Sequence, residues 1–122
     1  MLNFTCKNYN TELSSSLCDL WERREFADVT LSVSDGFIQA HRLVVSACSK
    51  LLHSILQECH HPHPLIYLKD ISISELRPIV NFMYYGEIKV TMENLDSFLS
   101  VAKELQAGIC NWIYCSTQAS LV

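Results

Sequence analysis

Glycine is scarce in this chain, and its scarcity argues against several kinds of active site. There are three glycines among 122 residues, and each stands at an expected turn or helix end. No Gly-rich loop is present to cradle a phosphate, and no Gly-x-Ser-x-Gly turn accompanies Ser46, Ser49 and His53, which lie close together in the sequence. Paired carboxylates are missing too. We therefore expect no enzymatic activity and no cofactor.

Basic clusters and long apolar runs are also missing. The nine Lys and Arg residues are scattered, apart from the pair Arg23-Arg24, and the net charge is −4. Binding of nucleic-acid phosphates needs a basic face, so we expect no direct contact with nucleic acid. No run of about 18 apolar residues is present to span a membrane, and Met1 to Lys7 lacks the features of a secretory signal. The sequence predicts a soluble intracellular protein.

The composition is that of one folded domain. Hydrophobic residues make up 49% and charged residues 18% of the chain, and 122 residues suit a single core. Six cysteines could form a disulfide framework in a secreted protein. Because thiols stay reduced inside cells, we interpret them as free core or surface thiols. They are Cys6, Cys18, Cys48, Cys59, Cys110 and Cys115.

One short run contains side chains that zinc prefers as ligands. It is Cys59-His60-His61-Pro62-His63. Structural zinc sites draw two pairs of ligands from separate segments, and a run this short, interrupted by a proline, cannot wrap one ion tetrahedrally. We interpret it as a solvated loop and expect no metal site.

Periodicity predicts the elements of the first half of the chain. Alternation over residues 2–6 predicts a short strand with one apolar face, and helical spacing of leucines predicts a helix over about residues 10–24. The pair Asp35-Gly36, between alternating runs at 29–33 and 37–40, predicts a β-hairpin. Ser49 is a predicted N-cap that divides residues 41–57 into two short helices.

The second half predicts two strands and two longer helices. Residues 65–68 form a compact apolar run typical of a buried strand, and Ser74 with Glu75 opens a helix that Gly86 ends in a left-handed conformation. Residues 87–90 are a predicted strand, and Thr91 caps a last helix that stops near Gly108. The predicted fold class is α+β, mostly helical, with a small mixed sheet.

Five blocks of sequence follow one another in an informative order. They are Phe26-Ala27-Asp28-Val29-Thr30-Leu31, Gln39-Ala40-His41-Arg42-Leu43-Val44-Val45-Ser46-Ala47-Cys48-Ser49, Leu68-Lys69-Asp70-Ile71, Phe82-Met83-Tyr84-Tyr85-Gly86-Glu87-Ile88 and Ala102-Lys103-Glu104-Leu105-Gln106. Each alone is a weak signal, but jointly they resemble the BTB/POZ family, and most closely its tramtrack/bric-à-brac insect subgroup. On this basis residues 1–109 are identified as a BTB/POZ domain, and residues 110–122 are a tail without a counterpart in the family.

The resemblance implies a BTB/POZ fold and a strand-exchanged homodimer or higher multimer. In this arrangement residues 2–6 pair with residues 87–90 of the partner chain. The leading strand and the apolar stripe of the first helix have few local partners, and pairing across a two-fold axis would cover both. The predicted dimer interface consists of Leu2, Phe4, Leu13, Leu17, Leu20, Trp21, Ile88 and Val90.

The resemblance also implies a charged pocket for partner proteins. It places Asp28, His41 and Arg42 at the base of the dimer groove, where zinc-finger relatives contact corepressors. The alternative is that Asp28 and Arg42 form an ion pair with a purely structural role.

These features together predict a protein-interaction and homodimerisation module of a transcription or chromatin regulator, located in the nucleus, with the cytoplasm as the alternative. The expected partners are the chain itself, related BTB proteins, and corepressor or chromatin proteins. One interpretation of the end at residue 122 is a short form without a DNA-binding region. The alternative function is a substrate adaptor of a cullin ubiquitin ligase, for which Leu56-Gln57-Glu58 loosely matches a hydrophobic-x-Glu motif.

Overall fold

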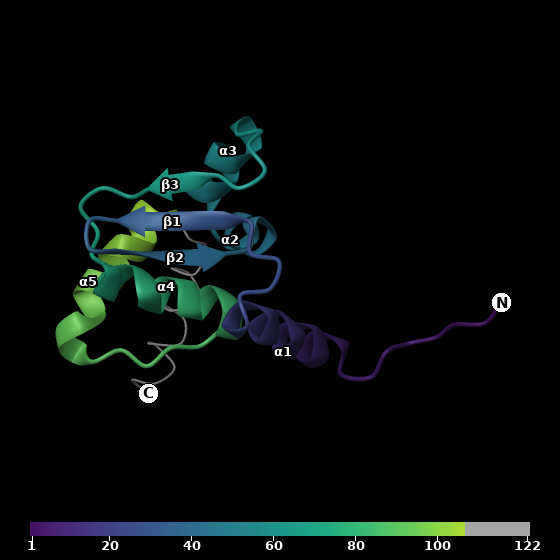
Figure 1. Cartoon of the computed structure of the whole chain (residues 1–122). Helices are drawn as coiled ribbons and strands as arrows, with labels where there is room; N and C mark the ends of the chain where they lie inside the picture. Colours follow the sequence, from purple (N-terminus) through teal and green to yellow (C-terminus); the bar gives the residue numbers. More distant parts are fainter. Residues whose placement is uncertain (107–122) are drawn as a thin grey trace.

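The computed structural model describes residues 1–106, which form five α-helices and one three-stranded sheet (Figure 1). In chain order the elements are α1 (Tyr9–Glu22), β1 (Val29–Val33), β2 (Gly36–Ala40), α2 (Arg42–Cys48), α3 (Lys50–Glu58), β3 (Leu65–Tyr67), α4 (Ile73–Tyr85) and α5 (Met92–Glu104). The prediction of a mostly helical α+β fold with a small mixed sheet is confirmed.

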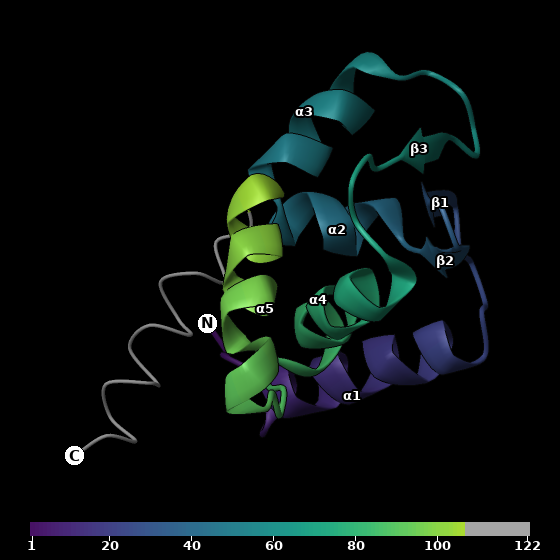
Figure 2. The ribbon, with the colours of Figure 1, turned by 90° about the vertical axis from the view of Figure 1, so that its left-hand side faces the viewer.

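The sheet has the strand order β2-β1-β3, and the helices of residues 1–106 lie on one of its faces (Figure 2). Strand β1 is antiparallel to β2, through the predicted hairpin, and parallel to β3. Figure 2 shows α2, α4 and α5 on one side of the sheet, and no helix of the described part of the chain lies against the other face. At the hairpin, a Cβ atom at Gly36 would lie 3.1 Å from the side chain of Ile73, so a larger residue there would require the start of α4 to give by a few tenths of an ångström.

The core lies between the inner face of the sheet and these helices. Val29 and Leu31 of β1 are fully buried there, as are Leu76 and Ile79 of α4. Buried and half-buried positions alternate along β1, as expected for a strand with one face against helices. The core therefore holds the sheet and the helices as one unit.

Local capping explains where the central helices begin. The Ser49 hydroxyl accepts the backbone N–H of Leu52 at 3.1 Å and donates to the carbonyl oxygen of Leu105 at 2.5 Å, so the predicted N-cap of α3 is confirmed and also joins α5. The predicted start of α4 at Ser74 is wrong. Ser72 is the N-cap and forms a reciprocal capping box with Glu75, because a serine three residues before a glutamate satisfies two free backbone donors.

The helix ends agree with the prediction where the structure describes them. Gly86 ends α4 with a φ of 74°, a left-handed conformation that glycine adopts without strain. Thr91 precedes α5, as predicted, but its side chain makes no capping hydrogen bond. The predicted stop near Gly108 lies outside the described residues.

Neither residues 2–6 nor residues 87–90 form a strand within the single chain. Residues 1–6 instead leave the domain as an extended segment (Figure 1). Asn8, at the junction with α1, has a φ of 60° and directs this segment outward. The predicted pairing joins two chains, so it stays a prediction.

Candidate functional site

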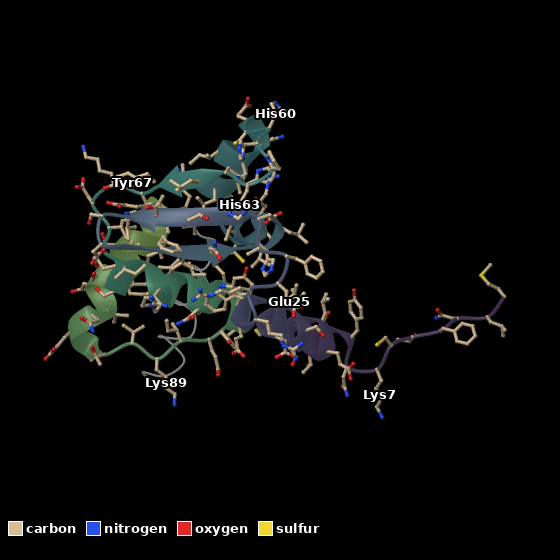
Figure 3. The ribbon with its side chains drawn as sticks, viewed as in Figure 1. Lys7, Glu25, His60, His63, Tyr67 and Lys89 are labelled. Carbon is tan, nitrogen blue, oxygen red and sulfur yellow. The ribbon has the colours of Figure 1, made fainter. Side chains whose placement is uncertain are left out.

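The N-terminal segment and the first half of α1 expose large apolar side chains. Leu2 is 83% exposed and Phe4 is 88% exposed, and Leu13 on α1 is 45% exposed. Figure 3 shows the side chains before the labelled Lys7 standing clear of the rest of the domain. Large apolar side chains left exposed in this way are typical of residues that a partner covers.

The second half of α1 is fixed to the domain by Trp21 and Cys18. The indole ring of Trp21 stacks on the ring of Tyr84, with centroids 4.5 Å apart and planes 5° apart. Its Nε1–H donates to the carbonyl oxygen of Gln39 at 3.0 Å, and the Cys18 thiol donates to the carbonyl oxygen of Tyr84 at 3.0 Å. This end of α1 is therefore part of the folded core.

The eight predicted interface residues fall into two groups. Leu2, Phe4 and Leu13 are exposed, whereas the other five are half-buried. Four of these five pack against the core of the same chain: Leu17, Trp21, Ile88 and Val90. The first group has the apolar surface that a second chain could cover, and the interface itself stays a prediction.

The structure brings Asp28, His41 and Arg42 together at the start of α2. The Asp28 carboxylate accepts the backbone N–H of Arg42 at 2.7 Å, and thus satisfies one of the donors that a helix start leaves unpaired. Within residues 1–106 no ion pair joins the two side chains. Their contact is therefore a hydrogen bond that positions α2, and partner binding at these residues remains a prediction.

His41 is buried, and all of its hydrogen-bonding groups are engaged. Its backbone N–H donates to the Tyr84 hydroxyl at 2.9 Å, its Nδ1 lies 2.6 Å from the same hydroxyl, and its Nε2 lies 2.7 Å from the carbonyl oxygen of Glu25. A carbonyl oxygen only accepts, so Nε2 carries a proton and donates to Glu25. The imidazole thus links the loop after α1 to α4.

Sequence reasoning missed the central part that Tyr84 plays in this network. Burial raises the pKa of Tyr84 to about 12, against a smaller opposite effect of its hydrogen bond with His41. Tyr84 follows His41 by 43 residues, and no local pattern connects the two. Its place in a block shared with the BTB/POZ family was the one available signal.

The Cys59 to His63 run follows α3 as a loop. The backbone N–H of His63 donates to Nδ1 of His61 at 3.0 Å, and Nε2 of His63 lies 3.0 Å from the Thr30 hydroxyl. Among residues 1–106 no three His, Cys, Asp or Glu side chains gather as a metal site would require.

A helix that spans a membrane must be both long and apolar. None of the helices of residues 1–106 combines the length and the apolarity that this requires.

The cysteines that the structure describes have no disulfide partner. Cys18 is buried, Cys6 is exposed, and Cys48 and Cys59 are half-buried. Burial raises the pKa values of the Cys18 and Cys48 thiols, which keeps both in the less reactive protonated form. The predictions for Cys110 and Cys115 lie outside the described residues.

Sequence comparison places this arrangement in a known class of domain. The family model of the BTB/POZ domain matches residues 17–115. The chain belongs to the BTB/POZ family, whose members are protein-interaction modules that self-associate and bind other BTB proteins.

The most informative relatives are proteins of Drosophila melanogaster. The chain is 41% identical over 99 residues to the Sex determination protein fruitless, covering 81% of this chain and 10% of that protein. It is 38% identical over 99 residues to the Longitudinals lacking protein-like, covering 81% of this chain and 78% of that protein. It is 37% identical to the Protein bric-a-brac 2 over 99 residues, covering 81% of this chain and 9% of that protein. The chain therefore aligns with small parts of fruitless and bric-a-brac 2, and these relatives confirm the insect subgroup.

The fold has a close structural counterpart. The BTB domain of zebrafish PATZ1 superposes with a TM-score of 0.83, and the match covers 100% of both chains at 23% sequence identity. At this identity the likeness supports the fold alone.

Proposed function

We propose that this chain is the homodimerisation module of a nuclear transcription or chromatin regulator. The observation that carries the proposal is the exposure of the apolar side chains of Leu2 and Phe4 on the N-terminal segment and of Leu13 on α1. A second copy is the occupant that fits best, because the family self-associates and a two-fold pairing would cover the same surface on both chains.

Light scattering on the purified chain tests this proposal directly. A single chain has a mass of 13.9 kDa, and we expect a species of about twice that mass. Leu13→Asp should return the mass to that of one chain, because a carboxylate buried in an apolar interface is costly. Ser15→Asp is the matched control, since it lies about 200° around the same helix and should leave the dimer intact. A wild-type chain that runs as a monomer would refute the proposal.

The proposal extends to mixed dimers with related BTB proteins. Co-expression with the Longitudinals lacking protein-like, 38% identical to this chain, should yield a complex that contains both chains. Recovery of separate homodimers only would limit the interaction to identical copies. Microscopy of the fluorescently tagged chain checks the nuclear location, and exclusion of the chain from the nucleus contradicts it.

Corepressor binding at Asp28, His41 and Arg42 is a second part of the proposal. Both Asp28 and Arg42 are half-buried and lie side by side at the start of α2. Asp28→Asn keeps an oxygen that can accept the Arg42 N–H but removes the charge, so it should weaken corepressor-peptide binding while the dimer persists. Unchanged affinity together with an unchanged dimer would contradict a binding role.

The alternative of a cullin substrate adaptor has no specific structural support. Leu56, the hydrophobic residue of the loose motif, is buried in the core and is not available to a partner. A pull-down with the N-terminal region of a cullin would distinguish the two functions.

A further inference from the structure

A groove lies where the end of α1, strand β2 and helix α4 meet. These three elements come together at the lower edge of the sheet in Figure 1, and the groove has a volume of about 330 Å³. Residues of all three elements line it, including Trp21, Phe37 and Arg77. It belongs to neither the exposed apolar surface of the N-terminal segment nor the predicted pocket at Asp28.

The aromatic part of the groove is held rigidly in place. The Trp21 ring lies between two tyrosines, stacked on Tyr84 and edge-on to Tyr85 at a centroid distance of 6.0 Å and an angle of 61°. The hydrogen bond from its Nε1–H to the carbonyl oxygen of Gln39 joins it to β2. The groove is therefore preformed, and a ligand would not have to order it.

Two arginines give the groove an excess of positive charge. Arg24 after α1 and Arg77 on α4 line it, together with the single carboxylate of Glu22. Glu22 accepts a hydrogen bond from the Tyr85 hydroxyl, which raises the pKa of Tyr85 to about 12. Within residues 1–106 neither guanidinium forms an ion pair with a carboxylate, so both are available on a chain whose net charge is −4.

An exposed aromatic side chain stands beside these charges. Phe37 on β2 lines the groove and is 59% exposed. Tyr85 is exposed as well. Aromatic and arginine side chains together are typical of the residues that dominate binding energy at protein interfaces.

We propose that this groove binds a segment of a partner protein that carries Asp or Glu beside an apolar side chain. The carboxylates of the segment pair with Arg24 and Arg77, because a guanidinium binds a carboxylate through two parallel hydrogen bonds. The apolar side chain covers Phe37. A nucleic acid fits less well, since Glu22 and the net charge of −4 repel an extended polyanion.

Fluorescence anisotropy with designed peptides tests the charge and apolar requirements separately. The probe is a labelled peptide of alternating Glu and Phe, and the comparison peptides replace Glu by Gln or Phe by Ser. Each replacement removes several carboxylates or several rings at once and should weaken binding by about tenfold, which corresponds to about 1.4 kcal/mol of binding free energy. Equal binding of all three peptides would overturn the proposal.

Matched variants locate the binding. Arg77→Glu should weaken binding of the Glu–Phe peptide by about tenfold or more, whereas Lys103→Glu, an exposed charge reversal on α5, should not. Phe37→Ala should weaken it, whereas Tyr67→Ala should not. Phe37 and Tyr67 are a close match, with exposed fractions of 59% and 58%, and both pair with Ser32 across the sheet.

Reversing the charge of the groove and of the peptide together gives the most discriminating test. Arg77→Glu should gain affinity for a Lys–Phe peptide, which a merely structural role of Arg77 would not produce. Equal losses of peptide affinity in the groove variants and in their control variants would refute the site. Displacement of the labelled peptide by oligouridylate, but not by unlabelled Glu–Phe peptide, would refute it as well. Light scattering on each variant should show the wild-type mass, so that failure of peptide binding is distinguished from failure of self-association.

Discussion

The two ends of α1 differ in what holds them. The end that contains Cys18 and Trp21 is joined to Tyr84 and Gln39 by a ring stack and two hydrogen bonds, whereas Leu13, near the start of the helix, is 45% exposed. A single helix thus belongs to the core at one end and offers an apolar surface at the other. Substitutions at the first end should therefore change folding stability, and substitutions at the second should change association.

The largest effect is expected from Trp21→Ala. It removes the stacked ring and leaves the carbonyl oxygen of Gln39 without its donor, so we expect the free energy of unfolding to fall by about 3 kcal/mol. Chemical denaturation at one fixed protein concentration measures it. Trp21→Phe is the control, since it keeps an aromatic ring and should cost about half as much. Equal stability of Trp21→Ala and the wild type would mean that this end of α1 is not anchored.

The next largest effect is expected from Tyr84→Phe. The change keeps the ring against Trp21 but removes the hydroxyl that both the backbone N–H and Nδ1 of His41 use. Leaving buried polar groups unpaired should lower the free energy of unfolding by about 2 kcal/mol. Tyr85→Phe, which alters an exposed hydroxyl, serves as the control and should cost less.

A smaller, pH-dependent effect follows from the same residue. The pKa of Tyr84 is raised from 10.0 to about 12 in the folded chain, so the folded state holds its proton more tightly than the unfolded state. The resulting stability is fully present below pH 10 and is lost as the pH rises toward 12. Denaturation curves across this range should show a steeper loss for the wild type than for Tyr84→Phe, and parallel losses would contradict the assignment.

The smallest effect on folding is expected from Leu13→Ala. Its side chain is largely outside the core of its own chain, so the free energy of unfolding, measured where the chain is monomeric, should change by less than about 1 kcal/mol. The dimer dissociation constant should rise instead, which sedimentation or light scattering across a dilution series measures. A large loss of folding stability without a change in association would reverse the comparison of the two ends.

Much of the fold could be predicted because its signals are local. The Asp35-Gly36 pair identified the hairpin, and Ser49 and Gly86 marked helix boundaries that the structure confirms. The start of α4 was misplaced although its signal was present. Ser72 lies three residues before Glu75 and therefore fits a capping box, which Ser74 does not.

The contacts of the site were harder to predict. They join residues that are far apart in the sequence, and the sequence does not tell which atom of each residue takes part. The sequence suggests that Asp28 and Arg42 interact, but it does not reveal that the carboxylate meets the backbone N–H of Arg42 instead of the guanidinium. No periodicity connects Trp21 with Tyr84, or Arg24 with Arg77, because only the packing of α1 on α4 brings them together.

The outward turn at Asn8 has a mechanical consequence. Its φ of 60° is a conformation that asparagine tolerates better than most residues, and residues 1–6 beyond it are extended. A segment of that length reaches about 20 Å, which exceeds the radius of gyration of about 13 Å typical of a domain of about 100 residues. A segment of this reach can therefore contact the near side of a neighbouring domain while Trp21 stays seated on Tyr84, so the predicted pairing with a second chain would require no unfolding of the first.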